Sequence, residues 1–571
     1  MKYLALVLAL VVCFQLEADS EQQIKDRMKL DLEIIRSAFE VGYAPKEWKL
    51  KYAGWDLDTE IAKAKDKVQN AQNITIKQYQ KILNDFFNSA KDYHVGILFH
   101  STEKAMLPFN VKGADGRYFI SYVDTTKLSR DNYHIFEGDE LVTFGGRPTH
   151  EVVQELRTTY TRLASELTDQ SIAEMMLTRR SGRAGMLVPR GPIVVGIKAP
   201  NEERIVQYQL IWNYSSERIN NTLNPILAES LDASDQLLPF FDTLMLSPWY
   251  GIFADKEKPE EDVKKSKKPV DLDMLGGRKS FIPDLGRVWW ESSPKNPFDA
   301  YIYENEDHRL IGYLRIPRYL GTTESIKEFE KIIKLFQERT DALIIDQINN
   351  PGGELFYTYT LLSMLTEKPL QTPLHRMTIT QDDVALSVAT IPILENVRND
   401  EDASKLTKLT LYGFPATHQT VQFILDYRFF IISEWNAGRF LTKPHHLFCI
   451  DHINPNPKTR YTKPILILIN QLDLSCADFF PAIMQDNKRA TLLGTRTAGA
   501  GGYVRSYRFP NRYGIDLFTY TGCISERADK NPIENLGVMP DIPYSLTQDD
   551  LQNNYKGYVK AINETVKRLV K

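Results

Sequence analysis

The chain has 571 residues, of which 43% are hydrophobic and 25% charged, the composition of a globular protein and not of a disordered or fibrous one. A single hydrophobic core is not expected at this length, which predicts roughly three to four domains. The net charge of -4 gives no electrostatic reason to expect nucleic acid or an anionic membrane as a partner.

Residues 1–18 have the pattern of a secretory signal peptide. Lys2 precedes an apolar run that is too short to span a bilayer comfortably, and Ala18 provides a small residue at a plausible cleavage point. Val12, which is not a small residue, precedes Cys13, and this argues against a lipoprotein site. We therefore predict a secreted protein with no further membrane segment.

Removal of this peptide would leave three cysteines, Cys449, Cys476 and Cys523, an odd number that forms no disulfide framework. A fold of this size needs no disulfides, and free thiols are also compatible with a reducing final compartment. The sequence has no spaced set of Cys and His ligands and no glycine pattern of a dinucleotide or P-loop site. We therefore expect neither a metal nor a cofactor.

Residues 19–104 predict a helical region that ends in a strand. Apolar residues recur at helical spacing up to about residue 90, and this period gives way to a strand between Asp92 and Phe99. His94 lies at that boundary. It is either a surface or core histidine, or a general base on a rigid element that Gly96 lets another segment approach.

Residues 105–229 turn to short strands and predict a PDZ-like domain. The segments Gly138 to Val142 and Gly145 to Pro148, followed by a helix from Val152 to Leu156, resemble the core of a PDZ module. Such modules add an extended peptide to a sheet edge. An unrelated β-rich domain is the alternative interpretation.

Residues 230–285 differ from their surroundings. An aromatic stretch from Leu237 to Phe253 should be buried, whereas the charge run from Asp255 to Pro269 has no packing period and is typical of a solvated linker. A segment of this kind suits either a linker or a removable inhibitory plug.

Residues 286–571 alternate strands and helices and predict an α/β core with a partly parallel sheet. Two buried strands, Ala342 to Asp346 and Pro464 to Ile469, each run into a polar turn. Turns at strand carboxyl ends are where sites form in α/β folds. We therefore expect the functional site at this edge of the sheet.

The two turns carry residues suited to acyl transfer. Gly352 and Gly353 have N–H groups that can approach an anion because no Cβ blocks the way. Ser475 lies where a helix should begin, so it is either the helix N-cap or a nucleophile held out at the sheet edge. In the second case the two glycines and the Cys476 N–H would form an oxyanion hole, although a glycine turn by itself is equally an ordinary turn.

Four motifs in order resemble the tail-specific (C-terminal processing) serine protease family, over a span from about residue 25 to the C-terminus. They are Ile345 to Gly353, Ser475 with the helix after it, Asp486 to Gly499, and Glu534 to Asp541. Many members of this family use a lysine after the serine as general base. Ala500 occupies that position here, so a Ser–Lys dyad is not available.

One branch of the family resembles this chain between Asp92 and Gly96 as well, and uses a histidine and a glutamate instead of the lysine. The resemblance implies that Ser475 is the nucleophile, that His94 is the general base and that Glu534 orients His94. The chemistry agrees, because serine needs an adjacent base and an imidazole needs a group that fixes its tautomer. The alternatives are Glu534 as a surface charge and Cys476 as the nucleophile.

The resemblance further implies a zymogen whose internal segment is removed autocatalytically, a homodimer after processing, and protein or peptide substrates. Delivery into a host cell after export is compatible with it. We therefore predict a secreted serine endopeptidase. The rival prediction is a non-catalytic relative that binds peptides in the PDZ-like groove.

Overall fold

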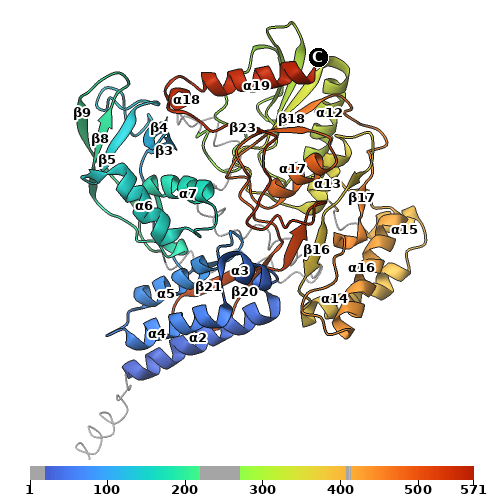
Figure 1. Ribbon diagram of the computed structural model, residues 1–571, viewed down its shortest axis with the longest axis horizontal. Helices are drawn as coiled ribbons and strands as arrows, with labels where there is room; N and C mark the ends of the chain where they lie inside the picture. The colour runs from blue at the N-terminus through green and yellow to red at the C-terminus, as the bar shows by residue number, and fades with distance from the viewer. Residues whose placement is uncertain (1–19, 219–270, 407–410, 412) are drawn as a thin grey trace, which may run out of the picture.

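The computed structural model describes residues 20–218, 271–406, 411 and 413–571 (Figure 1). The predicted signal peptide, residues 1–18, lies outside the described residues, as does most of the predicted internal segment. Within the described part of the chain, no helix is long and apolar enough to cross a membrane.

The N-terminal region is helical, as predicted. Its described helices are α2 (Glu21–Gly42), α3 (Lys46–Ala53), α4 (Leu57–Asn70) and α5 (Ile76–Ser89). The Ser20 and Thr75 side chains close capping boxes at the starts of α2 and α5. The buried face of these helices surrounds Phe39, and Phe518 from the far end of the chain belongs to the same cluster. The N-terminal helices are therefore packed onto the C-terminal half.

A small sheet connects the segment of His94 to that C-terminal half. Strand β1 (Gly96–Phe99) pairs antiparallel with β21 (Ile515–Thr521), which in turn pairs with β20 (Val504–Tyr507). In Figure 1 the β20–β21 hairpin reaches from the core to the N-terminal helices. His94 precedes β1 by two residues, so this pairing brings it beside a strand from the end of the chain.

The PDZ-like domain contains the strands and the helix that its sequence predicted, and one helix more. Its sheet has the order β3-β4-β5-β8-β9, with β6 paired to β5. Its strands are β3 (Phe109–Ala114), β4 (Arg117–Val123), β5 (Glu140–Phe144), β6 (Arg147–Pro148), β8 (Pro192–Lys198) and β9 (Ile205–Ile211). The predicted helix is α6 (Thr149–Tyr160), and the unpredicted one, α7 (Glu166–Thr178), also buries polar residues, which obscures its apolar period.

Short elements border this domain. A second sheet has the order β10-β2-β7. Its members and the adjoining 3-10 turn are β10 (Asn213–Ser215), β2 (Lys104–Met106), β7 (Arg179–Ser181) and η1 (Gly182–Ala184). The described end of the internal segment, residues 271–285, packs against both large domains: Leu275 lies in the core of the PDZ-like domain, and Phe281 and Leu285 lie in the C-terminal core.

The C-terminal core contains the predicted mixed sheet, in the order β11-β12-β13-β14-β18-β19-β23. Its strands are β11 (Arg287–Glu291), β12 (Ala300–Glu304), β13 (Leu310–Arg315), β14 (Ala342–Asp346), β18 (Ile465–Ile469), β19 (Thr491–Gly494) and β23 (Ile542–Pro543). The first three pair antiparallel, and the pairs from β13 to β23 are parallel. The carboxyl ends of β14, β18 and β19 therefore meet at one edge.

Helices cover both faces of this sheet, which explains the unbroken apolar runs of its strands. Leu343 and Ile467 pack with α12 (Thr323–Arg339), α13 (Leu355–Ser363) and α17 (Cys476–Asp486). Ile344 and Leu466 point to the other face and pack with α19 (Lys556–Leu569), which α18 (Gln548–Gln552) precedes.

A helical insertion extends from the core at the lower right of Figure 1 and was not predicted. It consists of α14 (Gln381–Glu395), α15 (Asp400–Leu406) and α16 (His418–Asn436). Short strands and a 3-10 turn flank it or lie beside it: β15 (Leu370–Gln371), β16 (Leu374–Met377), η4 (Leu447–Cys449), β17 (His452–Ile453) and β22 (Cys523–Glu526). α14 has no single apolar face turned to the core, so its sequence lacks the helical period from which a helix would have been predicted.

Candidate active site

Ser475 lies on a strained turn between β18 and α17. Its backbone has φ 57° and ψ -119°, a conformation that a residue other than glycine rarely adopts. Its side chain makes no capping hydrogen bond to the helix. The interpretation of Ser475 as a helix N-cap is therefore wrong, since a cap needs neither this geometry nor the roughly 1–3 kcal/mol that such a conformation costs. Strain of this kind is typical of a nucleophile held out from a sheet edge.

The Gly352 turn lies directly against Ser475. A Cβ on Gly352 would lie 2.6 Å from the Ser475 Cβ and 2.6 Å from the Leu474 carbonyl oxygen. The Leu474 N–H donates to the Asn350 carbonyl at 3.0 Å, and the Cys476 thiol donates to the Gly353 carbonyl at 3.3 Å. The two polar turns that the sequence singled out are thus in contact, and only glycine fits at position 352.

The N–H of Gly352 is used in a hydrogen bond within the glycine turn. The Gly352 N–H donates to the Asn350 side-chain oxygen at 2.8 Å. Among the described residues, the N–H groups of Gly353 and Cys476 donate to no acceptor. Of the three predicted oxyanion donors, the N–H groups of Gly353 and Cys476 are therefore available, whereas Gly352 shapes the turn.

Ala500, which stands where many family members have a lysine, is fully buried, and its backbone is hydrogen-bonded. Asp478, one turn into α17, accepts hydrogen bonds from the Thr497 hydroxyl and from the N–H groups of Gly499 and Ala500. Burial raises the pKa of Asp478 to about 6, and these three donors oppose the shift. The same helix that begins at Ser475 therefore holds the loop that leads to Gly501.

His94 is a buried residue with an ordered backbone, not a surface histidine. Its N–H donates to the Asp92 carboxylate at 2.8 Å, and its carbonyl accepts from the Thr519 hydroxyl at 2.7 Å. The ring is 2% exposed, and its Nδ1 has no hydrogen-bond partner within the described residues. Burial lowers the pKa of His94 to about 4, an effect that Asp92 opposes and Lys49 reinforces. The imidazole is thus neutral at pH 7, as a general base must be.

Glu534 is also buried, so its interpretation as a surface charge is wrong. One carboxylate oxygen pairs with the Lys49 ammonium, and the other accepts from the Gly501 N–H at 3.2 Å. Burial and the nearby Asp92 raise the pKa of Glu534, while Lys49 opposes them.

Within the described residues, the His94 ring donates no hydrogen bond to the Glu534 carboxylate that was predicted to orient it. Lys49 pairs with Glu534, and its ammonium lies 3.9 Å from the carboxylate of Asp92, which accepts the His94 N–H. The sequence offered no pattern that marks Lys49 as functional, because a lysine in a short charged helix is usually solvated.

A small cavity of about 40 Å³ adjoins Ser475. It is mostly apolar and is lined by Glu354, Leu355, Leu447, Phe448, Ser475, Cys476, Phe479, Gly502, Tyr503 and Cys523. Burial raises the pKa of the Cys476 and Cys523 thiols to about 12, so neither has appreciable thiolate character at neutral pH. This disfavours Cys476 as a nucleophile.

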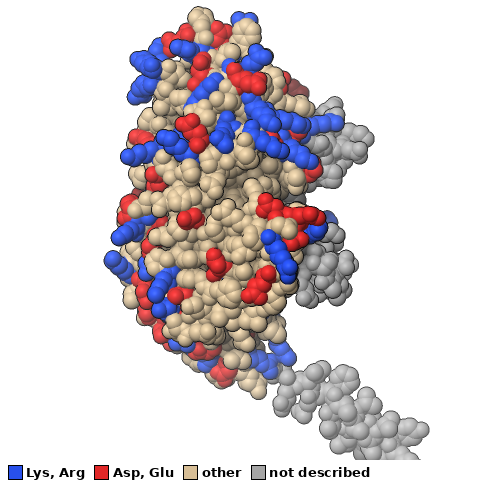
Figure 2. All heavy atoms as spheres, turned by 90° about the vertical axis from the view of Figure 1, so that its right-hand side faces the viewer, with Lys and Arg blue, Asp and Glu red and all other residues tan. Residues whose placement is uncertain are grey.

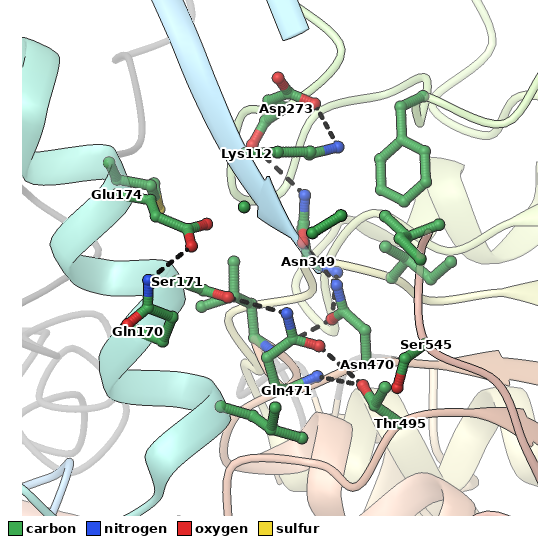
Figure 3. Close-up of a pocket in the computed structure, with 18 of the residues that line it drawn as sticks. Lys112, Gln170, Ser171, Glu174, Asp273, Asn349, Asn470, Gln471, Thr495 and Ser545 are labelled. Carbon is green, nitrogen blue, oxygen red and sulfur yellow. Dashed lines mark hydrogen bonds and ion pairs between the residues drawn. The ribbon is translucent and has the colours of Figure 1, made fainter. Parts of the chain in front are cut away.

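A larger cavity of about 480 Å³ lies between the PDZ-like domain and the core (Figure 3). Figure 3 shows Lys112 paired with Asp273 across it, at 2.6 Å, and Gln471 bonded to Ser171 of α7. Neither Ser475, His94 nor Glu534 lines this cavity, so we assign it no part in the chemistry. In the parts of the chain that the structure describes, no group of three or more His, Cys, Asp or Glu side chains could hold a metal ion.

The fold and the serine turn define a serine peptidase that carries a PDZ domain. A model of peptidase family S41 matches residues 310–544, and a PDZ domain model matches residues 103–219. The chain belongs to peptidase family S41, and the predicted family, fold class and enzyme class are confirmed.

Similar proteins match nearly the whole chain. An uncharacterised protein of Chlamydia muridarum is 36% identical over 568 residues, which is 95% of this chain and 92% of the relative. The crystal structure of mature CPAF complexed with lactacystin has a TM-score of 0.80 at 31% identity, covering 96% of this chain and 99% of that one. A carboxy-terminal-processing protease of Bartonella bacilliformis is 28% identical over 103 residues, covering 18% of this chain and 22% of the relative.

Proposed function

We propose that this chain is a secreted serine endopeptidase made as a zymogen, with Ser475 as the nucleophile, His94 as the general base and Glu534 as the third member of the site. The observation that carries the proposal is the strained, non-capping Ser475, held against a glycine turn and followed by an available N–H at Cys476. This combination is typical of a nucleophile with an oxyanion donor beside it.

In the proposed reaction, His94 removes the hydroxyl proton as the Ser475 oxygen attacks the scissile carbonyl. The N–H groups of Cys476 and Gly353 donate to the resulting oxyanion. The imidazolium then gives its proton to the leaving amine, which yields an acyl-enzyme that water hydrolyses with His94 again acting as base.

Glu534 supplies negative charge beside the His94 segment when the imidazolium forms. Because its two oxygens are bonded to Lys49 and Gly501, it acts on His94 through the charge of the buried cluster and not through a direct hydrogen bond. A buried carboxylate stabilises a nearby cation more strongly than an exposed one.

Turnover of casein or of a fluorogenic peptide by the processed protein tests the proposal. We expect turnover by the wild type, none by Ser475→Ala, and turnover by Cys476→Ala. A folded wild type without turnover would instead favour the non-catalytic peptide binder. Activity that survives Ser475→Ala and is lost in Cys476→Ala would identify a cysteine hydrolase.

We propose that residues within 230–285 form an internal segment that the enzyme removes from itself. Support comes from the described end of this segment, where Leu275 is buried in the cluster of the PDZ-like domain and Phe281 in that of the C-terminal core. It also comes from the CPAF structure, whose protein is described as mature. N-terminal sequencing of fragments tests this. We expect cuts within 230–285 in wild type and an intact Ser475→Ala chain, and equal cutting of both would rule out autocatalysis.

We also propose that the processed enzyme is a homodimer that uses the helical insertion. On α14, Val388 is 58% and Ile393 is 50% exposed. Phe429 and Trp435 of α16 are also exposed. Figure 2, which views the molecule from the side of this insertion, shows broad areas without charged side chains. A face of this kind is typical of a protein interface.

Sedimentation velocity of the processed enzyme tests the dimer. We expect a dimer that Val388→Glu with Ile393→Glu converts to a monomer. Leu187→Glu is the matched control, because Leu187 is 77% exposed and lies in the PDZ-like domain, away from the insertion. A dimer that survives the double substitution would place the interface elsewhere.

A further inference from the structure

Lys49 is a buried lysine whose three ammonium protons are all engaged in hydrogen bonds. Its side chain has no exposed surface. The ammonium donates to the Glu534 carboxylate, to the Asn535 side-chain oxygen at 2.7 Å and to the Lys91 carbonyl at 2.8 Å. Lysine is almost never buried completely unless it is paired, because transfer of its charge out of water costs several kcal/mol.

These three bonds join segments from opposite ends of the chain. Lys49 lies on α3, Glu534 and Asn535 lie in the C-terminal core, and Lys91 leads into Asp92 and His94. Asn535 closes the arrangement by donating to the same Lys91 carbonyl at 2.7 Å, and its oxygen also accepts from the Trp48 indole at 3.1 Å. The ammonium is therefore the point at which the His94 segment and the Glu534 loop are held together.

The lysine also determines the charge around His94. Asp92 and Glu534 are both buried, and two carboxylates so placed cannot both stay ionised without a cation. Lys49 opposes the rise in the pKa of Glu534 that burial and Asp92 cause, and so favours the ionised carboxylate. Three neutral donors also face the cluster: the Tyr43 and Thr521 hydroxyls donate to Asp92, and the Gly501 N–H donates to Glu534. A second buried cation, Arg162, interacts with the Asp92 charge as well.

We propose that Lys49 is a positioning residue for the general base, which holds the Glu534 loop fixed against the His94 segment. This inference rests on the proposed function and deepens it. Lys49 is not itself the base, because its ammonium has no lone pair and all three of its protons are engaged. It thus takes no proton from Ser475, unlike the lysine of the Ser–Lys members of the family, whose position Ala500 occupies.

The test compares Lys49→Met with Lys51→Met in the full, processed enzyme. Lys51 lies on the same helix and is exposed, so it controls for changes in α3 alone. We expect Lys49→Met to lower kcat about 10²-fold, the effect of a misplaced catalytic group, with KM little changed. The acid limb of kcat/KM should also shift to higher pH, because the positive charge that opposes protonation of His94 is gone. Lys51→Met should change neither.

A double-mutant cycle distinguishes positioning from a merely structural role. Glu534→Gln should lower kcat in wild type and cause little further loss in Lys49→Met, since the lysine acts through that carboxylate. Additive losses in kcat, or an unshifted acid limb, would overturn the proposal.

Lys49→Met removes the cation between two buried carboxylates and could therefore fail to fold. A second comparison then still tests the positioning role of Lys49. The variant Lys49→Met/Glu534→Gln restores the balance of charge and is compared with Glu534→Gln alone. Equal kcat values support the proposal, and a further tenfold loss in the double variant contradicts it. Loss of turnover in wild type would refute the proposed function itself, whereas an active wild type with a fully active Lys49→Met would refute only this inference.

Discussion

Substitution of Gly352 by alanine tests the contact between the glycine turn and the nucleophile. The new Cβ would lie 2.6 Å from both the Leu474 carbonyl oxygen and the Ser475 Cβ, and 3.1 Å from the Cys476 nitrogen. Two of these atoms are backbone, so they cannot rotate away as the end of a side chain could. The turn or the serine must shift, and the Cys476 N–H must shift with them.

Gly352→Ala should affect both the stability of the protein and kcat. Gly352 has φ 93°, where a Cβ costs about 1–2 kcal/mol of stability. The displacement adds the loss of an aligned oxyanion donor, which lowers kcat by about 10²–10³. We therefore expect Gly352→Ala to be modestly destabilised and to lose at least about 10² of kcat.

Gly146→Ala is the control that separates the effect on stability from the effect on kcat. Gly146 has φ 78°, and a Cβ there meets nothing within 4 Å. It should lose about the same stability in urea denaturation but no activity against a fluorogenic peptide. If Gly352→Ala keeps wild-type kcat, or if Gly146→Ala loses as much, the assignment of the glycine turn to the oxyanion site is wrong.

Four further outcomes are expected. Cys476→Ala keeps the backbone N–H and loses only neutral hydrogen bonds of the thiol, with Gly353 and Thr358, of about 0.5–1.5 kcal/mol each, so kcat should fall less than about tenfold; a larger loss in steady-state assays would give the thiol a chemical role. Because burial lowers the pKa of His94 to about 4, its base form persists below pH 6.5, and the acid limb of kcat/KM should lie nearer pH 4 than 6.5. The depressed pKa also means that the stability His94 contributes above about pH 6.5 is lost as pH falls toward 4, a loss that His94→Gln should abolish in urea titrations. Asp478→Ala leaves the N–H groups of Gly499 and Ala500 without their acceptor and should cost about 3 kcal/mol of unfolding free energy; an unchanged value would mean that water replaces the carboxylate.

The sequence predicted best where a short pattern determines its own geometry. The strand runs ending at Asp346 and Ile469, and the glycines and serine after them, predicted the sheet, its partly parallel order and the edge at which the site forms. These predictions needed only the burial of a central strand and the freedom of glycine. The resemblance then added His94 and Glu534, which no local pattern could have joined.

The rest depends on contacts between distant segments. Lys49 and Glu534 are 485 residues apart in the chain, and nothing in the residues around Lys49 distinguishes it from a solvated lysine. α14 was missed for a related reason: its buried positions include Ser387 and Thr390, while Val388 and Ile393 point outward. The apolar residues of α14 are spread around the helix and mark no single face, so no helical period was visible in the sequence.

The central claim is that Ser475 is the nucleophile, and covalent labelling tests it most directly. The processed wild-type enzyme is treated with a fluorophosphonate, which phosphonylates activated serines, and the modified peptide is identified by mass spectrometry. The account predicts a single adduct on Ser475 that is absent from Ser475→Ala. An adduct on Cys476 or another residue, or an active enzyme that takes no label, would contradict it.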